Sequence, residues 1–213
     1  MYLAITPQEL HLPPGAKVQL QYQTWADYEA MLQQRVDRAG LRIRYNARTQ
    51  LLTLMAPLPG HGKRAQTLAD LVKCLLRRQG QDWEAYDPIT LKQIDAAGVE
   101  PDVCFYVQHR EAVLGKERID LSIDPPPDLA LEIDLTSTTR PEDYAPLKVP
   151  EVWIYRRQSL LIYGFSGAGY EEMNQSIVFP EFSVKRLMPQ YVERAWLAGS
   201  SVALREFEAF LDG

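Results

Sequence analysis

One segment of this chain is apolar on both of its alternating faces. Residues 128–135 follow a stiff Asp124-Pro125-Pro126-Pro127 lead-in and read Asp-Leu-Ala-Leu-Glu-Ile-Asp-Leu. Because alternate residues of a strand point to opposite faces of a sheet, this segment predicts a central strand that is buried on both sides. Two carboxylates, Glu132 and Asp134, interrupt the apolar pattern where the strand ends. The chain therefore has to fold as a sheet that other elements cover on both faces.

A second acidic stretch, Glu100-Pro101-Asp102, opens the apolar run 103–107. Strand alternation predicts that Glu100 shares a face with Asp102, and that Glu132 shares one with Asp134. Asp102 and Glu132 lie on neighbouring predicted strands. Like charges at the end of a buried strand are costly unless something positive neutralises them, and hard cations such as Mg²⁺ prefer carboxylate oxygens. The pattern predicts a metal site, with the alternative that backbone amides or an arginine satisfy the two carboxylates.

The remaining periodicity predicts one α/β (α+β) domain with a central mixed sheet flanked by helices. It spans residues 1–213, with an N-terminal helix and hairpin extension (about 1–56) and C-terminal helices (about 187–213). Residues 1–23 are expected to be irregular, and Thr24 is expected to cap the first helix. Helices are expected at about 24–38, 61–78, 187–198 and 202–212, with a helical turn at 140–147. Strands are expected in a hairpin over 41–55 and at 83–86, 88–94, 99–107, 128–135, 151–156 and 159–165.

Composition limits the function classes. The net charge is −5, which counts against nucleic-acid binding because lysine and arginine make most phosphate contacts. Cys74 and Cys104 lie in apolar runs and read as buried thiols suited to a reducing compartment. We see no charged-then-apolar leader and no apolar run near the roughly 18 residues that a membrane helix needs. A cytoplasmic protein with no membrane contact is expected.

Several stretches together resemble a known family. They match the Uma-type endonucleases, a domain-of-unknown-function family of the restriction-endonuclease-like PD-(D/E)XK superfamily, whose signature is Pro-Asp followed by (Asp/Glu)-x-Lys. The resemblance covers most of the chain and is carried by residues 55–61, 99–107, 124–137 and 149–153.

The resemblance implies a restriction-endonuclease-like fold and metal-dependent hydrolysis of phosphodiester bonds, with DNA as the expected substrate. It also implies that the carboxylates of Asp102 and Glu132 and the backbone carbonyl of Ile133 hold Mg²⁺ or Mn²⁺. The metal would polarise the scissile phosphate and lower the pKa of the attacking water. Many nucleases of this superfamily act as homodimers, so a homodimer is a further expectation.

The sequence departs from the signature at the lysine position, where Asp134 stands. Some relatives carry the lysine on the short helix after the strand, and spacing back from Tyr144 places Arg140 there. Arginine stabilises negative charge but stays protonated and cannot act as a base. Lys92 and, less favourably placed, Lys148 are other candidates. The expected catalytic set is Asp102, Glu132, Asp134, Lys92 and Arg140.

Other positions have two interpretations. His61, which follows Pro59-Gly60, either caps a helix or lines the cleft near the metal. The basic groups Lys63-Arg64 and Lys73-Arg77-Arg78 either contact a nucleic-acid backbone or form a solvated helix face. Relatives often carry a Glu where this chain has Gly62. The departures keep two further hypotheses open, a catalytically inactive relative that serves as a binding or regulatory module, and a hydrolase of another phosphate ester.

Overall fold

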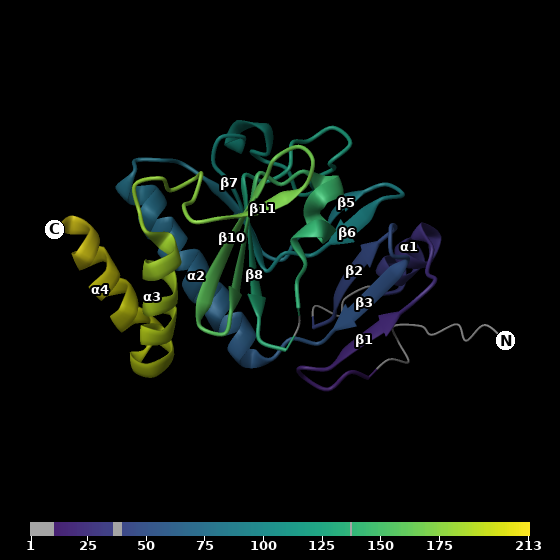
Figure 1. The fold of residues 1–213 in the computed structure, drawn as a ribbon, viewed down its shortest axis with the longest axis horizontal. Coiled ribbons are helices and arrows are strands. Elements are labelled where there is room, and N and C mark those ends of the chain that lie inside the picture. The colour runs from purple at the N-terminus through teal and green to yellow at the C-terminus, as the bar shows by residue number, and fades with distance from the viewer. Residues whose placement is uncertain (1–10, 36–39, 137) are drawn as a thin grey trace.

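The computed structural model describes residues 11–35, 40–136 and 138–213, which form two β-sheets and a set of helices (Figure 1). The helices are α1 (Trp25–Gln34), α2 (Pro59–Arg78), α3 (Val184–Ala198) and α4 (Ser200–Asp212), with the 3₁₀ helices η1 (Arg110–Ala112) and η2 (Pro141–Leu147). The strands are β1 (Lys17–Leu20), β2 (Arg42–Asn46), β3 (Leu51–Met55), β4 (Glu84–Tyr86), β5 (Leu91–Gln93), β6 (Ala97–Val99), β7 (Val103–Tyr106), β8 (Leu129–Asp134), β9 (Glu151–Arg156), β10 (Ser159–Phe165) and β11 (Tyr170–Met173). None of the described helices combines the length and apolarity that a membrane span requires.

The six-stranded sheet has the order β11-β10-β9-β8-β7-β4 and forms the centre of the fold. It is mixed, because β8 runs parallel to β9 while its other neighbour, β7, is antiparallel. All six residues of β8 are buried, as the doubly apolar pattern predicts. Residues of α2, α3 and α4 pack on one face of this sheet in the largest hydrophobic cluster. The opposite face packs against η2 and β5, so both faces are covered as expected.

The five-stranded sheet is entirely antiparallel and has the order β1-β3-β2-β6-β5. Its β2–β3 hairpin is the one that the alternation over 41–55 predicts. Ile43, Tyr45, Leu52 and Leu54 point to one face, where they pack with Tyr28 of α1 in a separate hydrophobic cluster. The residues between them point to the other face. In Figure 1 this sheet and α1 lie at one side of the molecule, while α3 and α4 lie at the other.

The expected single strand over 99–107 is wrong in one respect, because the chain forms two strands there. β6 belongs to the five-stranded sheet and β7 to the six-stranded sheet. The break falls at Pro101, which has no N–H to continue a ladder of hydrogen bonds. Glu100 therefore stays with the first sheet, where its Oε2 accepts a hydrogen bond from the Ile43 N–H at 2.8 Å. Asp102 enters the second sheet, where its N–H donates to the Leu131 carbonyl at 3.0 Å.

Two edge strands depart from the expected pattern. β1 lies within the segment expected to be irregular, and β11 follows the Gly167 turn where no strand is expected. Both have only four residues, and each pairs with a single neighbour. Short, partly exposed edge strands bury few side chains, so their apolar alternation is weak.

The helix boundaries agree closely with the expected ones. Thr24 caps α1 through a reciprocal capping box with Asp27, which accounts for the start of that helix. The expected end near Arg38 lies outside the described residues. α2 begins at Pro59, two residues before the expected start, because proline suits the first turn of a helix. Cys74 and Cys104 are buried free thiols, and burial raises the pKa of Cys74 to about 11 and that of Cys104 to about 12.

Candidate active site

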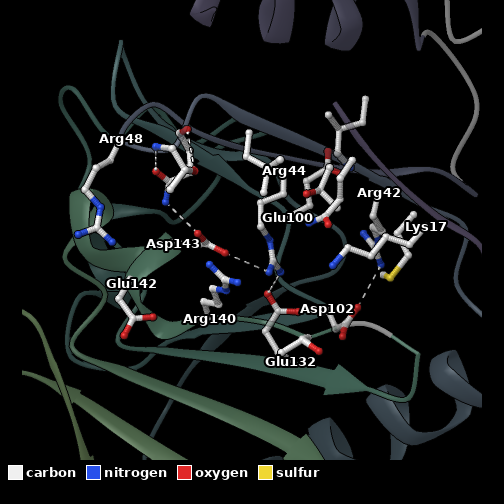
Figure 2. A pocket seen from close by; sticks show the side chains of 18 residues that line it. Lys17, Arg42, Arg44, Arg48, Glu100, Asp102, Glu132, Arg140, Glu142 and Asp143 are labelled. Atoms are coloured by element: carbon white, nitrogen blue, oxygen red, sulfur yellow. Dashed lines mark hydrogen bonds and ion pairs between the residues drawn. The ribbon is translucent and has the colours of Figure 1, made fainter. Parts of the chain in front are cut away.

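A cleft of about 770 Å³ lies between the two sheets. One wall is the open face of β1, β3 and β2. The other wall holds Asp102, Glu132 and residues from the loop and 3₁₀ helix that follow β8. Figure 2 shows Lys17, Arg42 and Arg44 on the first wall, opposite the two carboxylates. The two acidic strand ends therefore meet at one cleft, as the sequence predicts.

Asp102 is 3% exposed and has a different set of partners at each oxygen. Its Oδ2 accepts a hydrogen bond from the Ile133 N–H at 2.8 Å and lies 3.2 Å from Nε2 of His61. Burial lowers the pKa of His61, but the hydrogen bond and negative charge of Asp102 outweigh burial, so this pKa is raised. Oδ1 of Asp102 lies 3.8 Å from Nη2 of Arg42 and accepts no hydrogen bond from a residue that the structure describes. His61 therefore contacts the site carboxylate from α2, but it is not among the described residues that line the cleft.

Glu132 is 5% exposed, and all of its hydrogen bonds within the described chain reach one oxygen. Its Oε1 accepts from Nη2 of Arg44 at 2.6 Å and from the Tyr144 hydroxyl at 2.5 Å. Burial raises the pKa of Glu132 to about 7; Arg44 opposes this shift, and the charge of Asp102 adds to it. The same burial raises the pKa of Tyr144 well above its usual range. Arg44 and Tyr144 thus orient this carboxylate through Oε1, while Oε2 accepts no hydrogen bond from a described residue.

The structure does not bring Asp134, Lys92 or Lys148 to the lining of this cleft. Asp134 accepts hydrogen bonds from Thr139 and from Arg156, which stands opposite it on β9. Its side chain is fully buried and fixes the loop that leads into η2. Lys92 extends from β5 of the other sheet and pairs with Glu29 of α1 at 2.8 Å. Asp134 shares a strand face with Glu132, as the alternation predicts, but Arg156 already neutralises Asp134.

Arg140 does line the cleft. It is the exposed N-terminal cap residue of η2 and forms no ion pair with any residue in the described part of the chain. Sequence reasoning missed Lys17, Arg42 and Arg44, which reach the cleft from the N-terminal hairpin region. The available signal was that Arg42 and Arg44 alternate with Ile43 and Tyr45, so both arginines have to point away from the small core. Nothing local shows that they face the carboxylates.

The donor set suits Mg²⁺ better than a metal held by many side chains. No group of three or more His, Cys, Asp or Glu side chains among the described residues could hold a metal ion. Mg²⁺ commonly binds through one or two carboxylates and completes its shell with waters and substrate phosphates. Oδ1 of Asp102 and Oε2 of Glu132 are hard oxygen donors without hydrogen-bond partners in the described chain, and both residues line the cleft. The residues therefore fit a water- and phosphate-completed Mg²⁺ site.

Comparison with known proteins gives one family and one fold. The model of the Uma2 family, described as "Putative restriction endonuclease", matches residues 25–193. The crystal structure of a "putative nuclease belonging to DUF820" from Anabaena variabilis superposes with a TM-score of 0.53, covering 85% of this chain and 98% of that chain. The sequence identity is 13%, so this likeness shows the restriction-endonuclease-like α+β fold. No curated protein matches the chain.

Proposed function

The chain belongs to the Uma2 family, described as "Putative restriction endonuclease", and from this membership we propose that it hydrolyses phosphodiester bonds of DNA with Mg²⁺ or Mn²⁺ as cofactor. The observation that carries the proposal is the pair Asp102 and Glu132, which lie in one cleft opposite a wall of cations. A phosphodiester that enters this cleft meets positive charge on one side and the metal-binding carboxylates on the other.

Asp102, Glu132 and the backbone carbonyl of Ile133 would hold the metal. A bound divalent cation supplies charge stabilisation and lowers the pKa of a water nucleophile. The chain itself orients the ligands: the Ile133 N–H fixes Asp102, and the Tyr144 hydroxyl fixes Glu132. Arg140, exposed at the cleft, is proposed to offset phosphate charge in place of the signature lysine.

A second candidate is a catalytically inactive module that binds nucleic acid without cleaving it. Arg44 already neutralises Glu132, as the alternative interpretation of the carboxylates expects. Asp134 stands at the signature lysine position and is itself paired with Arg156. Both observations favour a protein that has lost catalytic activity at this site while keeping the fold.

An assay with supercoiled plasmid DNA separates the two candidates. The purified chain is incubated with the plasmid in Mg²⁺, in Mn²⁺ or in EDTA, and nicked and linear products are measured over time. We expect products in either metal and none in EDTA. Plasmid that stays supercoiled in both metals would support the inactive module. Cleavage of small phosphodiesters with no attack on the plasmid would instead indicate a hydrolase of another phosphate ester.

We further propose that the protein forms a homodimer through its C-terminal helices. Trp196, Leu197 and Phe210 on α3 and α4 are 43%, 83% and 49% exposed, and such apolar groups are typical of interaction surfaces. Sedimentation equilibrium is expected to give twice the chain mass, and Leu197→Glu is expected to shift the protein toward monomer. The matched control is Ile123→Glu, at an equally apolar residue that is 81% exposed on a distant loop. A monomeric wild-type protein at micromolar concentration would contradict this proposal.

A further inference from the structure

The open face of the five-stranded sheet is cationic, although the whole chain is acidic. The cleft-lining residues of β1, β2 and β3 include Lys17, Arg42 and Arg44, and none of these strands contains an acidic residue. The acidic residues of the cleft come from outside these three strands, chiefly from the opposite wall. Figure 2 shows Lys17, Arg42 and Arg44 opposite Asp102 and Glu132, with Glu100 beside the two arginines and Arg140 beside Asp143. A net charge of −5 therefore does not describe the surface that a ligand in this cleft would meet.

The strand register fixes the positions of these cations on the face of the sheet. Lys17 and Arg42 both stand opposite Met55, one on each side of β3. Arg44 stands opposite Thr53 in the next row of the same face. Two residues along a strand cover about 7 Å, which is comparable with the distance between successive phosphates of a nucleic-acid strand. The face is therefore a short two-dimensional array of positive charges on a rigid sheet.

Arg42 has weaker internal contacts than Arg44, the other arginine of this array. Its Nη2 lies 3.8 Å from Asp102 Oδ1 and 3.9 Å from Asp87 Oδ1. Its Nε is buried and has no hydrogen-bond partner, and its guanidinium donates no hydrogen bond to any residue that the structure describes. Buried polar groups are normally paired, and the planar guanidinium fork matches the oxygens of a phosphate. A guanidinium that lines a cleft, has carboxylate neighbours only at 3.8 and 3.9 Å and donates no hydrogen bond to a described residue keeps its donors available for an anionic ligand.

Lys17 supports the same conclusion. It lines the cleft and forms no ion pair within the described chain. Burial, together with the nearby charge of Arg44, lowers its pKa. The negative charge of a phosphate placed between Lys17 and Arg44 would oppose this lowering of the Lys17 pKa.

The basic residues at the end of α2 differ from this array. Lys73 pairs with Asp70, Arg77 with Glu208 and Arg78 with Asp212. This group is therefore neutralised within the protein, which favours the solvated-face interpretation of its role.

We infer that the cationic face, formed by Lys17, Arg42 and Arg44, binds the phosphodiester backbone of DNA, with Arg42 as its principal phosphate contact. This inference rests on the proposed function and adds the surface that holds the substrate against Asp102 and Glu132. Backbone contacts of this kind position a nucleic acid without reading its sequence.

Binding of a short fluorescein-labelled DNA duplex of mixed sequence tests the inference. Fluorescence anisotropy is measured with the full chain in EDTA at several salt concentrations. We expect Arg42→Gln to weaken binding about tenfold and to reduce the slope of log Kd against log salt by about one, since one phosphate contact is lost. Arg42→Lys should retain the slope. Arg78→Gln makes the same charge change on α2 and should leave both quantities unchanged.

Folding is a limited concern, because Arg42 makes no close internal hydrogen bond, and circular dichroism checks it. Unchanged affinity and slope in Arg42→Gln would overturn the inference, as would an equal loss in Arg78→Gln. The assay contains no cleavage step. A protein that binds DNA through Arg42 but never cuts the plasmid would retain this inference while the nuclease proposal fails.

Discussion

Plasmid cleavage is expected to fall at least about a thousandfold when Asp102 is replaced by asparagine. The amide oxygen can still accept the hydrogen bond that the Ile133 N–H gives to Asp102, so the local geometry should persist. The change removes one of the two negative charges proposed to hold the metal. Metal-based charge stabilisation is worth several kcal/mol in a transition state, and each factor of ten in rate corresponds to about 1.4 kcal/mol.

The structure supplies a matched control for this variant. Asp128 is also a buried aspartate next to β8, but it lies at the opposite end of that strand, where its Oδ2 accepts from the Val107 N–H at 2.7 Å. Asp128→Asn is expected to keep cleavage close to the wild-type rate if it remains folded. Calorimetric titration with Mn²⁺ should lose its binding heat in Asp102→Asn and keep it in the control. Wild-type cleavage by Asp102→Asn would remove this residue from the proposed mechanism.

Replacing Arg44 by methionine is expected to lower the free energy of unfolding by about 3–5 kcal/mol, because the partner left behind is a buried charge. Arg44 is the only basic residue within hydrogen-bond distance of Glu132 in the described chain. Methionine preserves much of the side-chain volume, so the loss is mainly electrostatic. Measurements belong at pH 8, above the pKa of about 7 that Glu132 has in the wild-type protein. Because Arg44 lowers this pKa, removing Arg44 raises it, and the stability lost in the variant should increase as the pH rises.

The double variant Arg44→Met/Glu132→Met should recover most of this loss, because buried ion pairs can often be replaced by apolar pairs at little cost. Recovery should be incomplete, since the Tyr144 hydroxyl loses its acceptor. Urea unfolding measures all three variants. Arg194→Met breaks the exposed pair with Glu206 and should have a much smaller effect. Strictly additive losses in the double variant would show that Arg44 and Glu132 are not energetically coupled.

Local patterns predicted the elements that bury the most side chains. The run that is apolar on both faces predicted β8 as the central strand, and the amphipathic stripe of residues 61–78 predicted α2. The path of the chain through Pro101 was not predictable in the same way. Whether residues 97–99 pair with β7's sheet or with β2 depends on contacts far away in the sequence. An apolar run shows that a strand is buried but not which strand it joins.

The same distinction applies to the candidate site: contacts between neighbouring elements were predictable, and contacts between segments far apart in the sequence were not. Asp102 and Glu132 could be placed together because their strands are neighbours in the sequence of elements. Arg44 precedes the carboxylate that it contacts by 88 residues, so only the packing of one sheet against the other brings them together. Lys92 had the right charge, but its strand lies in the sheet that carries the opposite wall, and its side chain turns to Glu29.

The ion pair between Arg44 and Glu132 has a consequence for metal affinity. A divalent cation that approaches Oε2 of Glu132 meets a carboxylate whose other oxygen is 2.6 Å from a guanidinium nitrogen. The measured dissociation constant would then reflect an exchange between two competing counter-ions rather than the intrinsic strength of the oxygen ligands. A polyanionic substrate that draws Arg44 toward itself would release the carboxylate at the same moment, so metal and substrate should each bind more tightly when the other is present.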